Sequence, residues 1–205
     1  MEKNQRSAAE AAMDTNEQVI AKGKIFELVQ RTQPDGRVFE TARRAPGVRL
    51  IIADRANKKV LLTREFRQEL DDWDYRLPGG KVFDTLEEFE QYRASGDDIV
   101  LAAVEKGKQE GREEAGVTIG ALHLVNKSTL GATVEWDLYI MEADMWELAT
   151  DGQALEQGEQ IEADTWLSYD DAEKLILNGD MQEERVALIL LRWIAGQNKE
   201  ASDEK

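Results

Sequence analysis

Apolar residues occur in short runs between turn-forming residues in the first third of the chain and at helical spacing further on. Apolar runs flank the turn Pro34-Asp35-Gly36, which predicts two strands within residues 18–40. Two stronger strands are predicted over residues 48–53 and 60–63, and their polar connection at 54–58 is typical of a hairpin. Later strands are expected near residues 121–127, 136–143 and 161–167.

Helices are predicted where capping residues precede a helical pattern of apolar positions. Thr85 and Glu88 have the spacing of a capping box, which opens a helix to about residue 93. Asp98 is an N-cap for a longer helix over residues 99–115, which Gly116 ends. Two more helices are expected over residues 169–177 and 183–195. Strands and helices in this mixed order indicate an α/β or α+β sandwich in one domain.

Composition and charge narrow the class of protein. The formal net charge of −16 argues against a nucleic-acid or anionic-membrane partner, because both are usually met by a basic face. The chain lacks an apolar run of the roughly 18 residues that a membrane helix needs. It has no cysteine, so disulfides and zinc–thiolate sites are excluded, which fits a cytoplasmic protein.

The helix predicted over residues 99–115 has one face with almost no side-chain volume. Ala103, Gly107 and Gly111 are four residues apart and therefore lie on the same side of the helix. A glycine inside a helix costs about 1 kcal/mol relative to alanine. We therefore expect this face to pack its backbone closely against a sheet.

The same helix carries three glutamates at the spacing i, i+3 and i+4, namely Glu110, Glu113 and Glu114. Their carboxylates converge on one face and repel each other, and a hard divalent cation would remove that repulsion. The alternative is a solvated acidic stripe that forms salt bridges with its basic neighbours on the helix. Those neighbours are Lys106, Lys108 and Arg112.

Residues 109–117 resemble the second half of the Nudix box, and the loop Leu77-Pro78-Gly79-Gly80-Lys81 precedes them. The positions that match are Glu110, Glu113, Glu114, Gly116 and Val117. The sequence departs from the box at two positions: Gln109 stands where the family has arginine, and Gly111 stands where it has an aliphatic residue. An insertion of about fifteen residues, at 84–98, also separates the loop from the helix, and a loop of that length costs little stability.

A wider resemblance to the ADP-ribose pyrophosphatase branch of that family runs in order from residue 18 to residue 177. Its parts are a strand ending in Glu65-Phe66-Arg67 before the glycine loop, the segment 130–143, and the acidic loop 155–162. The resemblance implies a Nudix-type α/β/α sandwich with a mixed β-sheet over residues 47–196. It also implies an N-terminal hairpin at 18–46 that joins two copies into a homodimer. Flexible polar tails are expected at 1–17 and 197–205.

The resemblance further implies hydrolysis of the diphosphate bond in a nucleoside-diphosphate-linked small molecule such as ADP-ribose or another nucleotide sugar, with Mg²⁺ or Mn²⁺. It assigns the metal to Gly79, Glu110, Glu113 and Glu114, and catalysis to Glu110 with Glu159 or Glu156 as the base or a further ligand. It assigns substrate binding to Arg67, Gly80 and Glu135. For Arg67 a salt bridge with Glu65 or Glu69 is an equal alternative. Because Gln109 weakens the box, a nucleotide-binding or regulatory module with impaired catalysis is the second hypothesis.

Overall fold

The computed structural model describes residues 17–155 and 160–203, and contacts divide the chain into two compact units. The first unit contains the chain up to Pro46 together with Phe83–Asp97 and Thr129–Asp137. The second contains Gly47–Val82, Asp98–Ser128 and Leu138–Lys205. Among the described residues, no helix is long and apolar enough to cross a membrane.

The first unit is built on a four-stranded sheet in the order β1-β2-β3-β9. β1 (Glu17–Lys22), β2 (Phe26–Thr32) and β3 (Val38–Arg44) are antiparallel, and β9 (Val134–Glu135) pairs in parallel with β3. The sequence predicted two strands here, but the first predicted run divides into β1 and β2. The division falls at a tight turn in which the amide of Gly23 donates to the carbonyl of Phe26 at 2.7 Å.

The inserted segment folds within this first unit as helix α2 (Leu86–Ser95). The predicted capping box is confirmed, because Thr85 accepts from the amide of Glu88 at 3.1 Å and the Glu88 carboxylate accepts from the amide of Thr85. Two bonds hold the helix to the sheet: the amide of Leu86 donates to the carbonyl of Lys24, and Lys22 pairs with Glu90 at 2.8 Å. The insertion is therefore an ordered part of the first unit.

The second unit contains two sheets. One has the order β4-β10-β8 and consists of β4 (Gly47–Ile51), β10 (Asp137–Leu148) and β8 (Val117–Thr129), with β4 and β10 parallel. The other has the order β11-β6-β5, with β7 paired to β6, and all of its pairings are antiparallel. Its strands are β5 (Ala53–Asp54), β6 (Lys59–Arg67), β7 (Asp72–Arg76) and β11 (Ile161–Ser168).

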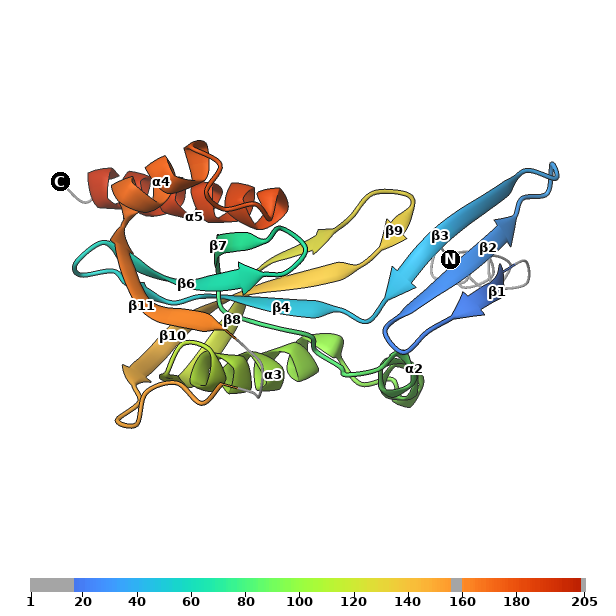
Figure 1. The fold of residues 1–205 in the computed structure, drawn as a ribbon, viewed down its shortest axis with the longest axis horizontal. Coiled ribbons are helices and arrows are strands. Elements are labelled where there is room, and N and C mark those ends of the chain that lie inside the picture. Colours follow the sequence, from blue (N-terminus) through green and yellow to red (C-terminus); the bar gives the residue numbers. More distant parts are fainter. Residues whose placement is uncertain (1–16, 156–159, 204–205) are drawn as a thin grey trace, which may run out of the picture. The chain divides into compact units, whose positions relative to one another are not determined.

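Helices cover both faces of the sheets in this second unit. Helix α3 (Ile99–Glu113) lies on one face, and α4 (Tyr169–Leu177) and α5 (Glu184–Asp203) lie on the other (Figure 1). The apolar stripe of α5 is buried as expected, since Leu190 is 0% exposed and Trp193 only 7%. The predicted fold class, a mixed α+β sandwich, is confirmed.

The glycine face of α3 packs as its spacing predicted. A Cβ atom at Gly107 would lie 3.0 Å from a methyl carbon of Leu122 and 3.1 Å from one of Leu50. A Cβ atom at Gly111 would lie 2.5 Å from a methyl carbon of Ile119. Close approach of the helix backbone to β4 and β8 therefore offsets the low helix propensity of these two glycines.

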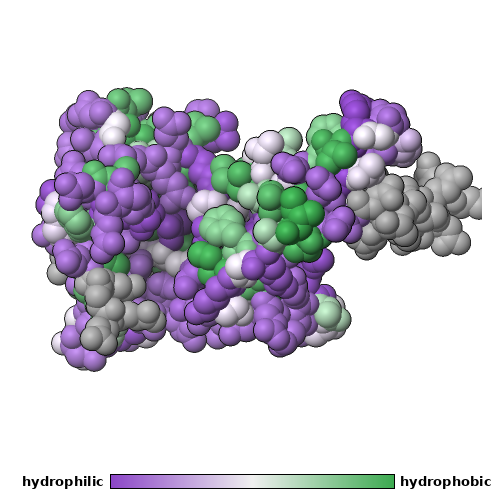
Figure 2. Space-filling view, turned by 45° about the vertical axis from the view of Figure 1, so that its right-hand side comes forward, coloured by the Kyte–Doolittle hydropathy of each residue, from purple (hydrophilic) through white to green (hydrophobic). Residues whose placement is uncertain are grey.

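Hydrophilic residues dominate the face of the molecule in Figure 2, in keeping with the net charge of −16. Apolar side chains are nevertheless exposed on the three antiparallel strands of the first unit. They are Val19, Ile20, Phe26, Val38 and Phe39, each between 41% and 51% exposed.

Candidate active site

A glycine loop runs beside the first strand of the second unit. The carbonyl groups on either side of Gly79 accept hydrogen bonds from the amides of Val48 and Leu50, at 2.9 and 2.8 Å. The φ angle of Gly79 is +140°, and a Cβ atom there would lie 2.9 Å from the Cα of Arg49 and closer still to the carbonyl of Val48. This backbone path therefore requires glycine.

Two of the predicted glutamates on helix α3 meet this loop. The amide of Gly79 donates to Oε2 of Glu114 at 2.6 Å. A Cβ atom at Gly80 would lie 2.7 Å from the carboxyl carbon of Glu110, so the Glu110 carboxyl group occupies the space that a side chain at position 80 would fill. Residues 79, 80, 110 and 114, which the sequence proposed as site residues, are thus brought together.

Burial dominates the electrostatics of these two acids. Glu110 is only 8% exposed, and burial raises its pKa, while Lys106 at 3.1 Å opposes the rise. Burial also raises the pKa of Glu114 to about 8. The Gly79 amide and the positive charge of Arg49 oppose that rise, and the charge of Glu110 adds to it. Glu110, which is buried, and Glu114, which is partly buried, are neighbouring carboxyl groups that favour a bound proton or a bound cation.

A network of ion pairs that the sequence did not predict lies on the other side of the loop. Arg49 donates through Nη1 to the carbonyl of Gly79, and its Nη2 lies 3.5 Å from Glu183. Arg76 also lies 3.5 Å from Glu183 and pairs at 2.9 Å with Asp74, which is fully buried. The signal in the sequence was an arginine inside the otherwise apolar strand 47–51, because a charge in that position needs partners.

Two further predicted site residues, Glu113 and Glu135, make other contacts. Glu113 is partly exposed, and its backbone carbonyl accepts from the amide of Ala154 at 3.0 Å. Glu135 lies in the first unit and pairs with Arg31 at 3.1 Å. Glu156 and Glu159 fall outside the described residues.

Arg67, the predicted phosphate ligand, is engaged in ion pairs. It lies 2.9 Å from Glu65 and donates through Nε to Glu69 at 2.7 Å. These are the two salt bridges that the sequence offered as the alternative to phosphate binding. Glu65 also acts on the site, because its charge raises the pKa of Glu114.

The donor atoms of these residues decide whether the site suits a metal ion. Among residues 17–155 and 160–203, no group of three histidine, cysteine, aspartate or glutamate side chains is arranged to hold a metal ion. Glu110 and Glu114 offer carboxylate oxygens beside the loop, and oxygen donors suit Mg²⁺ and Mn²⁺. The carbonyl of Gly79, which the sequence proposed as a metal ligand, accepts a hydrogen bond from Arg49 instead. The chemistry of these donors thus fits a hard cation, which their mutual repulsion also favours.

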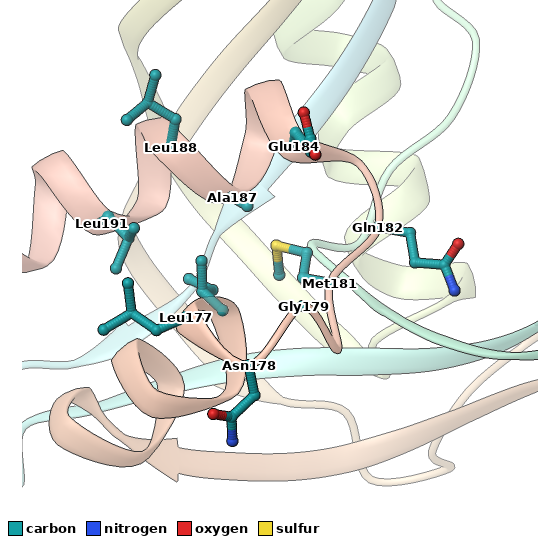
Figure 3. A pocket seen from close by; sticks show the side chains of 10 residues that line it. Leu177, Asn178, Gly179, Met181, Gln182, Glu184, Ala187, Leu188 and Leu191 are labelled. Atoms are coloured by element: carbon teal, nitrogen blue, oxygen red, sulfur yellow. The ribbon is translucent and has the colours of Figure 1, made fainter.

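A separate hollow lies between the end of α4 and the start of α5, with a volume of about 630 Å³ (Figure 3). Its lining combines apolar side chains with polar ones: Leu177, Met181, Leu188 and Leu191 lie beside Asn178, Gln182 and Glu184. It contains none of the residues that the sequence proposed as site residues, so the hollow is distinct from the glycine loop and its glutamates.

Comparisons with known proteins support the fold. No protein-family model matches the chain, and no curated protein matches it. Among solved structures, a crystal structure of an ADP compounds hydrolase matches with a TM-score of 0.61 and 21% sequence identity. The match covers 89% of this chain and 94% of that chain. It therefore extends over both compact units, and at this identity it establishes the likeness of the fold.

Proposed function

We propose that the chain is a hydrolase that cleaves the diphosphate bond of a nucleoside-diphosphate-linked compound, such as ADP-ribose or another nucleotide sugar, with Mg²⁺ or Mn²⁺. The observation that carries the proposal is the glycine loop next to two glutamates of α3 and its end, one buried and one partly buried, with Gly79 bonded to Glu114 and Gly80 against Glu110. The fold of an ADP compounds hydrolase supports the same substrate class.

Each residue of the site then has a chemical task. Glu110 and Glu114 would hold the cation, and the side-chain-free loop at Gly79 and Gly80 would let the diphosphate approach the backbone. The bound cation neutralises phosphate charge and makes water more acidic. Water attacks one phosphorus and the P–O bond to the bridging oxygen breaks, so a nucleoside monophosphate and a sugar phosphate leave.

The proton of the attacking water passes to a carboxylate. We assign this role to Glu159 or Glu156 on the resemblance of the acidic loop. Arg67 would serve the substrate by exchanging Glu69, its more exposed partner, for a phosphate oxygen, because a guanidinium binds phosphate and carboxylate in the same fork geometry.

The first experiment measures release of nucleoside monophosphate from a panel of nucleotide sugars with Mg²⁺, with Mn²⁺ and with EDTA. Glu114→Gln is the test variant, because its amide oxygen can still accept from Gly79 while the charge is lost. Glu105→Gln is the matched control: Glu105 lies on the same helix, its side chain is 73% exposed, and it pairs only with Lys108 in the hydrogen bonds described. Metal-dependent release that is lost in E114Q and kept in E105Q supports the proposal.

A binding module that holds a nucleotide without turnover is the second candidate. It is favoured by the lack of a three-acid metal group among the described residues and by Gln109 in place of the family's arginine. Calorimetry with ADP-ribose separates the two candidates. Metal-dependent binding with no release from any compound would establish the binding module and reject the hydrolase.

We further propose that two copies associate through the strands of the first unit. The exposed apolar side chains of β1 and β3, among them Val19, Ile20 and Phe39, support a partner surface there. Sedimentation of the wild type and of Ile20→Lys tests this: we expect a dimer that the charged variant dissociates, and a monomeric wild type would contradict it.

A further inference from the structure

Arg49 is the one charged residue of strand β4. Its neighbours Val48 and Leu50 are 0% exposed and face Gly107 of α3. Because side chains alternate along a strand, Arg49 projects from the opposite face, away from α3. Its side chain is only 11% exposed, so this guanidinium is largely removed from water and needs protein partners.

One partner of Arg49 is the loop at the site. Nη1 donates to the carbonyl of Gly79, whose amide donates in turn to Glu114 at 2.6 Å. The two peptide groups of Gly79 are thus held by charged side chains from two different elements, β4 and the end of α3. Hydrogen bonds to charged groups are about twice as strong as neutral ones, so this pair of contacts fixes the loop firmly.

The second partner of Arg49 is Glu183, 3.5 Å from Nη2. Glu183 lies at the start of helix α5, where its carbonyl accepts from the amides of Val186 and Ala187 at 2.9 and 3.0 Å. Arg76 lies at the same distance from Glu183 and is itself held by buried Asp74. Arg49 is therefore bound to the start of α5 on one side and to the glycine loop on the other.

We propose that Arg49 is a positioning residue for the hydrolysis: it fixes the carbonyl of Gly79 so that the loop keeps its place over Glu110 and Glu114. This inference rests on the proposed function. Arg49 acts on the loop and not on the substrate, so its loss lowers kcat and leaves KM close to the wild-type value. Partners that orient a group at a metal site typically contribute about 10- to 100-fold in activity.

The test compares three variants in the full chain. Arg49→Met keeps the length and apolar packing of the stem and removes the guanidinium. Arg49→Lys keeps a donor for the carbonyl of Gly79, but its single Nζ cannot replace the two Nη atoms that bind Gly79 and Glu183 separately. The matched control is Arg185→Met, because Arg185 is about as buried as Arg49 and pairs with the same Glu183 at 3.5 Å.

Two readouts are measured on each variant. Hydrogen–deuterium exchange of the peptide spanning residues 77–82 reports the loop without any substrate, and steady-state kinetics reports kcat and KM. For R49M we expect loop exchange roughly tenfold faster, since a local opening loses its restraint, and kcat about 10- to 100-fold lower with KM within about threefold. R49K recovers part of both losses, and R185M keeps wild-type values in both.

The outcomes separate this inference from the proposed function. Unchanged loop exchange in R49M overturns the positioning role whatever the activity, and so does wild-type kcat in R49M or an equal loss in R185M. A rise in KM with kcat kept would make Arg49 a substrate ligand and overturn the proposal as well. Absence of hydrolysis in the wild type, with faster loop exchange in R49M, rejects the proposed function and the catalytic part of this inference together, and leaves Arg49 a structural brace.

Discussion

Replacing Gly80 by alanine tests whether the closeness of the loop to Glu110 matters for catalysis. The added Cβ would lie 2.7 Å from the carboxyl carbon of Glu110, whereas carbon atoms in contact prefer about 3.5–4.0 Å. Glu110 must therefore move by about 1 Å. Overpacking of this kind costs about 1–3 kcal/mol, and alanine recovers about 0.4–1 kcal/mol by restricting the unfolded chain. We expect a net loss of roughly 1–2 kcal/mol in the free energy of unfolding.

The effect of Gly80→Ala on activity should far exceed its effect on stability, because a displacement of about 1 Å at a reacting centre can cost about 100-fold in rate. The assay is kcat for the best nucleotide-sugar substrate at saturating Mg²⁺, with urea unfolding alongside. Gly131→Ala is the control, since a Cβ there meets nothing within 4 Å and its φ is not in the left-handed region. Wild-type kcat in G80A would refute the assignment of Glu110 to the reacting centre.

Three further predictions concern stability. In EDTA, the free energy of unfolding of the wild type falls as the pH rises from about 4.5 towards 8, because burial raises the folded-state pKa of Glu114 to about 8 and the folded state then disfavours the ionised form. At about 1.4 kcal/mol per pKa unit, Glu114→Gln keeps several kcal/mol that the wild type loses by pH 9. Urea titrations at pH 5 and pH 9 measure this difference. Trp193→Phe removes the 2.7 Å bond to Glu142, which is 4% exposed, and should lower the free energy of unfolding by about 2–3 kcal/mol at an unchanged urea m value. No change would mean that other neighbours of this carboxylate, such as Arg55 and His123, satisfy it without the tryptophan. Thr85→Ala removes the N-cap of α2 and should cost about 1 kcal/mol locally, seen as faster amide exchange over residues 86–95 with kcat unchanged; equal exchange would show that the cap is dispensable.

The features that the sequence predicted best are those that depend on local spacing. The four-residue repeat of small residues on α3 predicted close packing on a sheet, and Gly107 and Gly111 do pack there. The capping box at Thr85 and Glu88 and the N-cap at Asp98 are also present, because a cap depends on residues within one helical turn. Helix starts could therefore be placed from sequence alone.

The contacts that assemble the candidate site could not be placed in the same way. Gly79 and Glu114 are thirty-five positions apart, and Arg49 and Glu183 are separated by 134. No local pattern encodes such pairs, since they depend on which strand lies beside which loop. The resemblance to a family placed residues 79, 80, 110 and 114 at one site, but it assigned no role to Arg49, Arg76 or Glu183.

Gln109 is the departure from the family's box that motivated the binding-module hypothesis. Gln109 is exposed on α3, whereas the carbonyl of Gly79 is already held by Arg49 from β4. If Arg49 supplies the cationic support of the loop, an arginine at position 109 adds little, and Gln109→Arg should change kcat by less than about threefold, the scale of an exposed ion pair. A rise of about tenfold or more would mean that the loop lacks support on the helix side and that Arg49 does not replace it. Combining Gln109→Arg with Arg49→Met distinguishes these cases, because an arginine that restores activity only when Arg49 is absent shows that the two positions serve the same loop.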